Sequence, residues 1–334
     1  MKKSVFARSF AILLISCIFC SILSECGSSS KSSSSEPPVY SPLRVLVPEA
    51  PGSKSSSSEP PVYSPLRVLV PEAPGSDTLG SSPLTLDVSN ITQGYFVAQS
   101  DSADLVTSLQ ITAPTGVLYA YFIDPGENAV IPFTEGNGDY TVVGYQQIQG
   151  DQYAALYSEI LTVELENDFF PFLYPNQYVN FSPDSEASKL ALSMVSEDTT
   201  DVDALKQIYN YVVNNLTYDY DKAETVETGY LPDVDETLST KTGICFDYAA
   251  LTTAMLRSCD IPCKLQIGYT GDIKHAWIDV YIRSKGWVTN AVSFNGDSWS
   301  LMDPTFDSSA DSDDSEAIQD YIGNADNYTV QFTR

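Results

Sequence analysis

The chain has 334 residues and a formal net charge of −27, with 44 acidic against 17 basic side chains. This charge argues against a nucleic-acid partner, because phosphate binding needs clustered Lys and Arg, and it disfavours an anionic membrane surface. The simplest role of the charge is solubility. The length suffices for about two folded domains of roughly 100–200 residues each.

Residues 1–26 have the pattern of a bacterial secretory or lipoprotein signal. A basic start precedes an apolar run from Ser9 to Leu23, which is too short and too closely followed by polar residues to predict a membrane span. Cys26 is the preferred site of lipidation, since it follows the apolar run and precedes a serine run. Lipidation at Cys17 and plain secretion remain alternatives. A lipid would anchor the chain to the outer face of the membrane, and we expect no other membrane contact.

Residues 27–83 are rich in Ser and Pro and contain a tandem duplication. Residues 31–53 read KSSSSEPPVYSPLRVLVPEAPGS, and residues 54–76 repeat them without a change. Because proline fixes φ and removes a backbone donor, this composition predicts a flexible linker in which length matters more than detail. A partner-binding peptide that is presented twice is the alternative.

In residues 84–165, apolar and polar residues alternate with a period of two. Leu84, Leu86 and Val88 alternate with polar residues, and further strand-like runs cover residues 117–123, 138–145 and 161–165. Short alternating strands between turn residues predict a small immunoglobulin-like β-sandwich. This stretch contains no cysteine and therefore no internal disulfide, and we interpret it as a spacer or binding module.

Residues 166–334 mix helical and strand-like patterns and predict an α+β domain. Residues 185–196 and 201–215 are expected to be helices, the second with Thr200 and Asp203 at its start. A third helix begins near Gly243–Cys245 and continues until Pro262. The strand-like runs that follow are residues 264–269, 275–282, 287–292 and 299–302.

Three residues of this domain could together form a catalytic triad. Cys245 lies where a helix begins, and the unpaired N–H groups of a helix N-terminus favour a thiolate. His275 is the only histidine of the chain and heads a strand, and Asp303 ends a later one. A nucleophile, a base and an orienting carboxylate are the roles that Cys, His and Asp share in convergent triads.

The residues around this triad resemble the three motif blocks of the transglutaminase-like superfamily, in order and at similar spacing. The blocks are KTGICFDYAAL at 241–251, HAW at 275–277 and MDPTF at 302–306. The resemblance runs from Asp201 to the C-terminus and implies a papain-like core with acyl-transfer chemistry. It implies that Cys245 attacks a carbonyl, His275 carries the proton and Asp303 holds the imidazole.

Other polar and sulfur residues of this domain have simpler interpretations. The backbone N–H of Cys245 is the expected first oxyanion donor, with Tyr218 or Tyr230 as candidates for the second. Asp247 is expected to brace the helix start. Cys259 and Cys263 are interpreted as buried thiols, because a disulfide between them would close a very small loop.

We expect no cofactor and no metal site. The acidic run from Asp307 to Asp320 lacks the spacing of an EF-hand and is interpreted as a solvated loop. The sequence thus predicts a monomeric cell-surface thiol enzyme that acts on peptide or protein amide bonds as a peptidase, amidase or transamidase. The alternative is a binding or adhesion protein that uses the β-sandwich, with the transglutaminase-like domain as its scaffold.

Overall fold

The computed structural model describes residue 60 and residues 66–288, 292–294, 299–301 and 328–334. The described residues belong to one compact unit, Ser56–Arg334. Among them, no helix is both long and apolar enough to cross a membrane. Several predictions lie outside the described residues: the signal segment 1–26 with Cys17 and Cys26, the first repeat copy 31–53, Asp303, and the acidic run 307–320.

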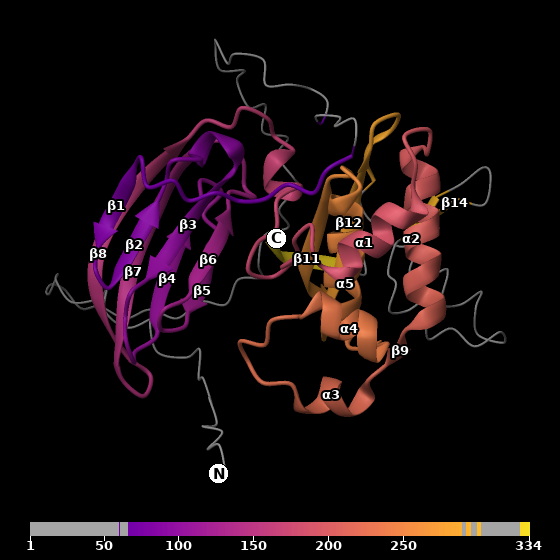
Figure 1. Cartoon of the computed structure of the whole chain (residues 1–334). Coiled ribbons are helices and arrows are strands. Elements are labelled where there is room, and N and C mark those ends of the chain that lie inside the picture. The colour runs from indigo at the N-terminus through magenta and orange to yellow at the C-terminus, as the bar shows by residue number, and fades with distance from the viewer. Residues whose placement is uncertain (1–59, 61–65, 289–291, 295–298, 302–327) are drawn as a thin grey trace, which may run out of the picture. The chain divides into compact units, whose positions relative to one another are not determined.

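The first half of the described chain forms two antiparallel four-stranded sheets (Figure 1). The first sheet has the order β1-β2-β3-β6, and the second has the order β5-β4-β7-β8. The strands are β1 (Thr78–Ser81), β2 (Leu84–Asp87), β3 (Tyr95–Ser100), β4 (Thr107–Thr112), β5 (Leu118–Ile123), β6 (Asn128–Pro132), β7 (Gly138–Gln149) and β8 (Gln152–Val163), with the 3₁₀ turn η1 (Ile91–Gln93) between β2 and β3.

The two sheets share a single hydrophobic core. On β5 the burial alternates strictly, so that Tyr119, Tyr121 and Ile123 lie inside while Leu118 and Phe122 lie outside. The same core takes buried side chains from β2, β3, β4, β6, β7 and β8. The predicted alternation is therefore confirmed for this half of the chain.

The predicted linker, residues 27–83, is wrong in its last part. Val68 and Leu69 of the second repeat copy are buried in two different hydrophobic clusters. Strand β1 also falls inside the predicted linker and pairs with β2, opposite Leu84–Asp87. The apolar run Leu66–Val70 thus contributes to the folded part of the chain, in spite of the prolines around it.

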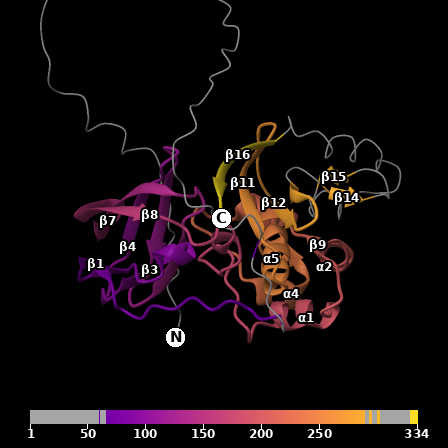
Figure 2. The ribbon, with the colours of Figure 1, turned by 90° about the horizontal axis from the view of Figure 1, so that it is seen from above.

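The second half combines helices with a four-stranded antiparallel sheet of order β13-β12-β11-β16 (Figure 2). A short parallel pair, β9 with β10, and a hairpin, β14 with β15, complete it. The helices are η2 (Phe170–Phe172), α1 (Glu186–Met194), α2 (Asp201–Asn215), α3 (Tyr220–Thr225), α4 (Val234–Thr240) and α5 (Cys245–Ser258). The strands are β9 (Thr217–Tyr218), β10 (Thr242–Gly243), β11 (Cys263–Thr270), β12 (Ile273–Ile282), β13 (Gly286–Val288), β14 (Val292–Phe294), β15 (Trp299–Leu301) and β16 (Tyr328–Thr333).

Helix α5 is the central element of this half. Every residue from Asp247 to Ser258 is buried, and the helix packs against α1, α2, α4 and one face of the sheet. Ala276, Ile278 and Val280 of β12 belong to the same hydrophobic cluster as α5. Because side chains alternate along a strand, His275, Trp277 and Asp279 lie on the opposite face of β12.

A fully buried arginine fixes the C-terminal end of α5. The guanidinium of Arg257 donates to the carbonyl of Cys263 through Nε and Nη2, at 3.0 and 2.8 Å, and to the carbonyl of Tyr174 through Nη1, at 2.7 Å. Nη2 also donates to the carbonyl of Arg334, at 2.9 Å. Burial lowers the pKa of Arg257 to about 10, so this side chain stays protonated at neutral pH. It joins the end of α5 to β11 and to the residue after β16.

A second buried arginine joins the end of the chain to the N-terminal sheets. Arg334 lies over the rings of Tyr119, Tyr121 and Tyr178, with its guanidinium carbon 4.2–4.9 Å from their centroids. Its Nη1 donates to the hydroxyl of Tyr121 at 2.9 Å. The residue that follows β16 therefore packs against β5 of the second sheet.

Most of the long predicted elements are confirmed. The helix predicted over residues 201–215 has those bounds, and Thr200 accepts the N–H of Asp203 at 3.2 Å as its cap. The expected strands at 264–269 and 275–282 correspond to β11 and β12. The short helices α3 and α4 and strands β1, β3, β4, β6 and β16 were not predicted.

Candidate active site

Cys245 is the first residue of α5, as the sequence predicts. It is partly exposed, whereas the helix from Asp247 to Ser258 is buried. Gly243 makes this helix start possible, because a Cβ at position 243 would lie 2.6 Å from the Cβ of Asp247. The thiol therefore lies at the accessible end of an otherwise buried helix, next to the N–H groups of its first turn.

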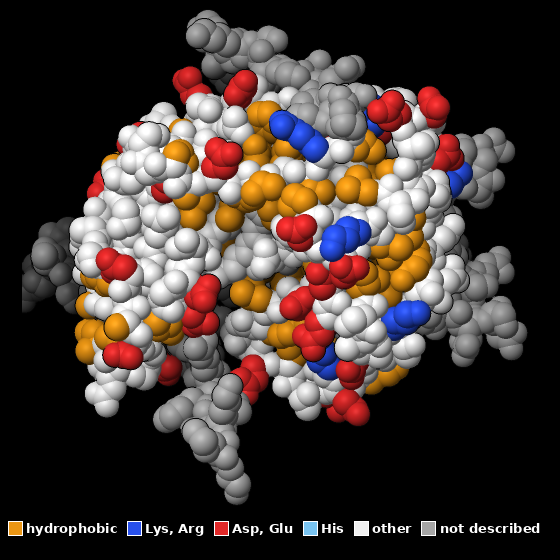
Figure 3. Space-filling view, viewed as in Figure 1, with side chains coloured by type: hydrophobic (Ala, Val, Ile, Leu, Met, Phe, Trp, Pro, Cys, Tyr) orange, Lys and Arg blue, Asp and Glu red, His pale blue; other side chains and the backbone are white. Residues whose placement is uncertain are grey.

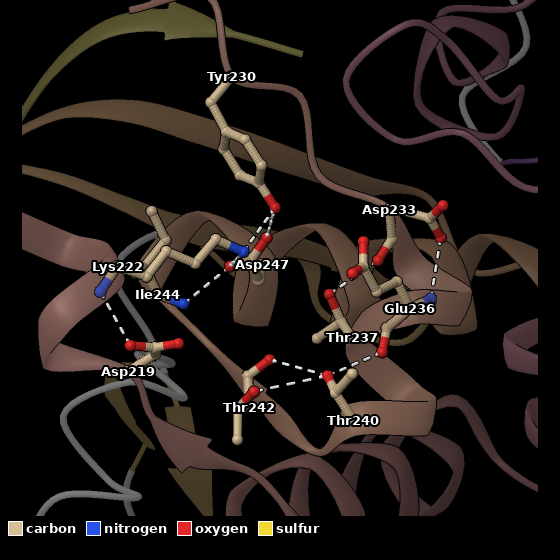
Figure 4. A network of polar contacts seen from close by, with 10 residues as sticks. All are labelled: Asp219, Lys222, Tyr230, Asp233, Glu236, Thr237, Thr240, Thr242, Ile244 and Asp247. Carbon is tan, nitrogen blue, oxygen red and sulfur yellow. Dashed lines mark hydrogen bonds and ion pairs between the residues drawn. The ribbon is translucent and has the colours of Figure 1, made fainter. Parts of the chain in front are cut away.

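Asp247 braces this helix start, as the sequence predicts. Its Oδ2 accepts the backbone N–H of Ile244, the residue before the helix, at 2.8 Å. The same oxygen accepts a bond from Lys222 Nζ at 2.7 Å, and Oδ1 accepts the hydroxyl of Tyr230 at 2.5 Å. Figure 4 shows Lys222 and Tyr230 reaching this carboxylate from different segments of the chain.

The polar network around Asp247 is tightly held. Burial lowers the pKa of Lys222, but its hydrogen bonds to Asp247 and Tyr230 outweigh this effect and leave the pKa raised. Burial and the bond to the Asp247 carboxylate raise the pKa of Tyr230 to about 12. At neutral pH Lys222 is therefore a cation and Tyr230 a neutral donor.

Lys222 was not predicted as a site residue, and Tyr230 has a different partner from the one expected. Asp219 caps the short helix α3 by accepting the N–H of Lys222 at 2.8 Å, and α3 presents the lysine to Asp247. The hydroxyl hydrogen of Tyr230 is donated to Asp247, so in this arrangement it does not serve an oxyanion. The sequence does carry a cue in Asp219, which has the pattern of a helix cap.

His275 is the third residue of strand β12 and is buried, with 6% of its surface exposed. Its ring stacks on Trp277, two residues along the same face, with centroids 6.2 Å apart and planes 18° apart. Tyr328 of β16 lies against both rings. Gly268 pairs with His275 across the sheet, and a Cβ there would come within 1.9 Å of the carbonyl oxygen of Thr329. Aromatic rings and a close sheet contact thus fix the imidazole.

The structure places two of the three predicted triad residues. Cys245 packs against the α5 cluster, whereas His275 lies on the face of β12 that points away from this cluster. Asp303 lies outside the described residues. The pairing of Cys245 with His275 and Asp303 therefore stays a prediction.

Cys259 and Cys263 differ from Cys245. Both are free thiols and both are buried, so the interpretation as buried thiols is confirmed. Burial raises the pKa of each to about 12. In the described part of the chain, no three His, Cys, Asp or Glu side chains gather in a way that could hold a metal ion.

Residues 188–304 match the family model of the transglutaminase-like superfamily. This segment is a transglutaminase-like domain. It contains α5 with Cys245, β12 with His275 and the position of Asp303. The resemblance seen in the sequence is therefore confirmed for this part of the chain.

Two curated proteins match parts of the chain. One is the uncharacterised protein YebA of Bacillus subtilis, 24% identical over 183 residues, which cover 48% of this chain and 25% of YebA. The other is the UPF0252 protein MJ1282 of Methanocaldococcus jannaschii, 40% identical over 62 residues, which cover 17% of this chain and 18% of that protein. The chain thus spans a quarter or less of the length of these relatives.

Two solved structures are also similar. A proposed cysteine protease from Cytophaga hutchinsonii has 18% sequence identity and a TM-score of 0.36, covering 72% of this chain and 79% of its own. A proposed protease from Parabacteroides distasonis has 13% identity and a TM-score of 0.27, covering 56% of this chain and 38% of its own. Likeness at this level carries no information on activity.

Proposed function

We propose that this chain is a thiol enzyme that acts on amide bonds of peptides or proteins, with Cys245 as nucleophile, His275 as base and Asp303 as orienting carboxylate. The observation that carries the proposal is the position of Cys245. It is a partly exposed thiol at the N-terminus of a buried helix, inside a transglutaminase-like domain. Cys259 and Cys263 of the same domain are buried and protonated, which leaves Cys245 as its reactive thiol.

The proposed reaction proceeds through an acyl-enzyme. His275 takes the proton of Cys245, and the thiolate attacks the amide carbonyl to form a C–S bond. The C–N bond breaks, and the amine leaves with the proton that His275 returns. Water or a second amine then attacks the thioester and releases Cys245, which gives hydrolysis or transamidation. The backbone N–H of Cys245 donates to the oxyanion in both steps.

The surface supports a peptide or protein substrate better than a polyanion. Figure 3 shows acidic side chains gathered over the part of the molecule where α1 and α4 lie in Figure 1. Glu186, Asp235 and Glu236 stand in the first turns of these helices. A surface of this sign repels nucleic acid and favours neutral or basic substrates.

We further propose that the enzyme acts at the cell surface and that its N-terminal sheets form an immunoglobulin-like sandwich. The signal segment supports an extracellular location, with a lipid on Cys26 or alternatively Cys17. Tyr140, near the start of β7, donates its hydroxyl to the carbonyl of Gly136 at 2.8 Å. A tyrosine that bonds back to the preceding corner in this way is a hallmark of immunoglobulin-like folds. The sandwich would act as a spacer, and the chain as a monomer.

The test is thiol labelling followed by product analysis. In the full chain, iodoacetamide at pH 8 should modify Cys245 and spare Cys259 and Cys263, and the modification should abolish cleavage of a peptide library. Cys245→Ala should lose activity by a factor on the order of 10⁴ or more, while Cys259→Ala, the control, keeps it. Product analysis with and without a primary amine separates hydrolysis from transamidation. Unchanged activity in Cys245→Ala would refute the proposal.

A binding or adhesion role for the N-terminal sheets is the second candidate. The outer face of the second sheet exposes Leu118 and Phe122 on β5 and Ile160 on β8, at opposite edges. Rows of paired residues connect them across β4 and β7. A partner that covers this face would bury apolar side chains at both edges of the sheet. If the full chain binds cell-wall material and Phe122→Ser abolishes binding while Cys245→Ala does not, this role is supported.

A further inference from the structure

The apolar run of the second repeat copy packs against the folded part of the chain. Val68 belongs to the cluster around α5, and Leu69 belongs to a separate cluster with Tyr95, Leu173 and Tyr281. Leu66 lines a cleft together with Ala204, Cys259 and Ile261. We call the surfaces that hold Leu66, Val68 and Leu69 the repeat seat. Val70, the next residue, is 55% exposed and lies outside the repeat seat.

Main-chain hydrogen bonds hold the end of the same copy. The N–H of Glu72 donates to the hydroxyl of Tyr95 at 2.9 Å, and the carbonyl of Glu72 accepts from Asn90 Nδ2 at 2.8 Å. The N–H of Gly75 donates to Asp87 Oδ2 at 2.6 Å. Burial raises the pKa of Asp87, but hydrogen bonds from Ser89 and from the N–H of Gly75 outweigh this effect and leave the pKa lowered, so the carboxylate is charged when it holds the copy.

All of these contacts are made by residues that occur twice. Leu43, Val45 and Leu46 stand in the first copy where Leu66, Val68 and Leu69 stand in the second, and Glu49 and Gly52 correspond to Glu72 and Gly75. Because residues 31–53 and 54–76 are identical, the first copy presents the same side chains and the same main-chain groups.

We propose that the repeat seat accepts either copy of the repeat from its own chain, so that Leu43–Val47 replaces Leu66–Val70 when the second copy leaves. Seating the first copy turns residues 53–76 into a loop before β1. Closing a loop of this length lowers the population of the state with the first copy seated by roughly a hundredfold. The free-energy cost of loop closure grows as three halves of RT ln n, where n is the number of residues in the loop. The second copy therefore occupies the repeat seat in most molecules, and the first copy binds there only when the second copy has left.

The exchange changes the reach of the chain that precedes the seat. With the second copy seated, residues 27–65 precede it, and with the first copy seated only residues 27–42 do. For a flexible chain this shortens the mean reach from roughly 35 Å to roughly 22 Å. If the proposed lipid anchor is present, the duplication provides two distances between membrane and enzyme. This consequence rests on the proposed localisation, whereas the exchange itself does not.

The test is site-specific photo-cross-linking in the full chain. p-Benzoylphenylalanine replaces Val47 or Val70, which flank the seated residues of the two copies, and cross-linked residues are mapped by mass spectrometry. From Val70 in the otherwise unchanged chain, we expect cross-links to residues around the repeat seat. From Val47, we expect the same cross-links at least tenfold more often in the Val68→Asp, Leu69→Asp chain than in the chain without these substitutions. When Val45→Asp and Leu46→Asp are added, these cross-links should be lost.

Each outcome decides the proposal. Failure of the cross-links from Val47 to rise in the Val68→Asp, Leu69→Asp chain overturns it, and so does their persistence in the fourfold variant. Cross-linked dimers in place of intramolecular products overturn the assignment to the same chain. If the Asp variants do not fold, Val68→Ala with Leu69→Ala provides the same comparison with a smaller rise. Val70→Asp, at the exposed neighbour, is the matched control and should leave the melting temperature unchanged.

Discussion

The two ends of α5 have different roles. At the N-terminal end Cys245 is partly exposed, and Asp247 next to it binds Lys222 and Tyr230. At the C-terminal end Arg257 is fully buried and bonds only to backbone carbonyls among the partners that the structure gives. One buried helix is thus held at both ends, by the charged network around Asp247 beside the partly exposed thiol and by the Arg257 bonds to backbone carbonyls at the other end.

Loss of Arg257 should have the largest effect on stability. Arg257→Met removes the donors for the carbonyls of Tyr174, Cys263 and Arg334, and buried unsatisfied carbonyls are costly. We expect the free energy of unfolding to fall by about 3–5 kcal/mol and the melting temperature by about 10 °C. Urea denaturation measures the first and calorimetry the second.

The control for Arg257 is an exposed cation of the same domain. Lys189 forms an ion pair with Glu186 on the surface of α1. Lys189→Met should change the free energy of unfolding by less than about 0.5 kcal/mol, because exposed ion pairs contribute little. Equal effects of the two substitutions would contradict the structural role assigned to Arg257.

Loss of Asp247 should affect both stability and activity. Asp247→Asn keeps the shape but removes the charge that pairs with Lys222 and accepts the N–H of Ile244. We expect a loss of about 1.5–3 kcal/mol in the free energy of unfolding, as for other hydrogen bonds to charged groups. The rate of Cys245 alkylation should also fall, since the helix start is less well fixed. An unchanged rate and unchanged stability would exclude Asp247 as a positioning residue.

Tyr230 should have a smaller effect than Asp247. Tyr230→Phe removes one hydrogen bond to the carboxylate and leaves the ion pair with Lys222 in place. The free energy of unfolding should fall by about 0.5–1.5 kcal/mol. Peptidase activity should persist at a reduced level, because the hydroxyl is committed to Asp247. Complete loss of activity in a stably folded Tyr230→Phe would instead favour a direct catalytic role, as an oxyanion donor.

The buried thiols predict a pH dependence with a defined sign. Burial raises the pKa of Cys259 and Cys263 to about 12 in the folded chain, above the ordinary value of 9.0. The unfolded chain therefore releases these protons first, and the free energy of unfolding should decrease as the pH rises above about 9. Double substitution with Ala should reduce this slope, as measured by urea denaturation at pH 8, 9 and 10. A slope that is unchanged in the double variant would contradict the burial effect.

Much of the candidate site could be predicted from the sequence. The start of α5 follows from Gly243 and the apolar run after Cys245, and β12 from the alternation after His275. The chemistry proposed for them follows from the residue types in the three motif blocks. These features depend on neighbours in the chain, and local patterns report them well.

The rest depends on contacts between distant segments. Strand β16 pairs with β11 across an intervening stretch of about 60 residues, and no local pattern encodes that register. Arg257 looks like a surface residue of a helix, because its partners are backbone carbonyls that have no signature in the sequence. The packing of Val68 and Leu69 was hidden by the prolines around them, which favoured a linker.

The central claim is that His275 activates Cys245, and the pH dependence of alkylation tests it most directly. The rate of Cys245 modification by iodoacetamide should be measured from pH 5 to pH 10 in the full chain, in His275→Gln and in Asp247→Asn. If His275 takes the proton of Cys245, alkylation near neutral pH should be fast in the full chain and at least tenfold slower in His275→Gln, with the two rates converging at alkaline pH. Profiles that coincide in the unchanged chain and in His275→Gln would contradict the account.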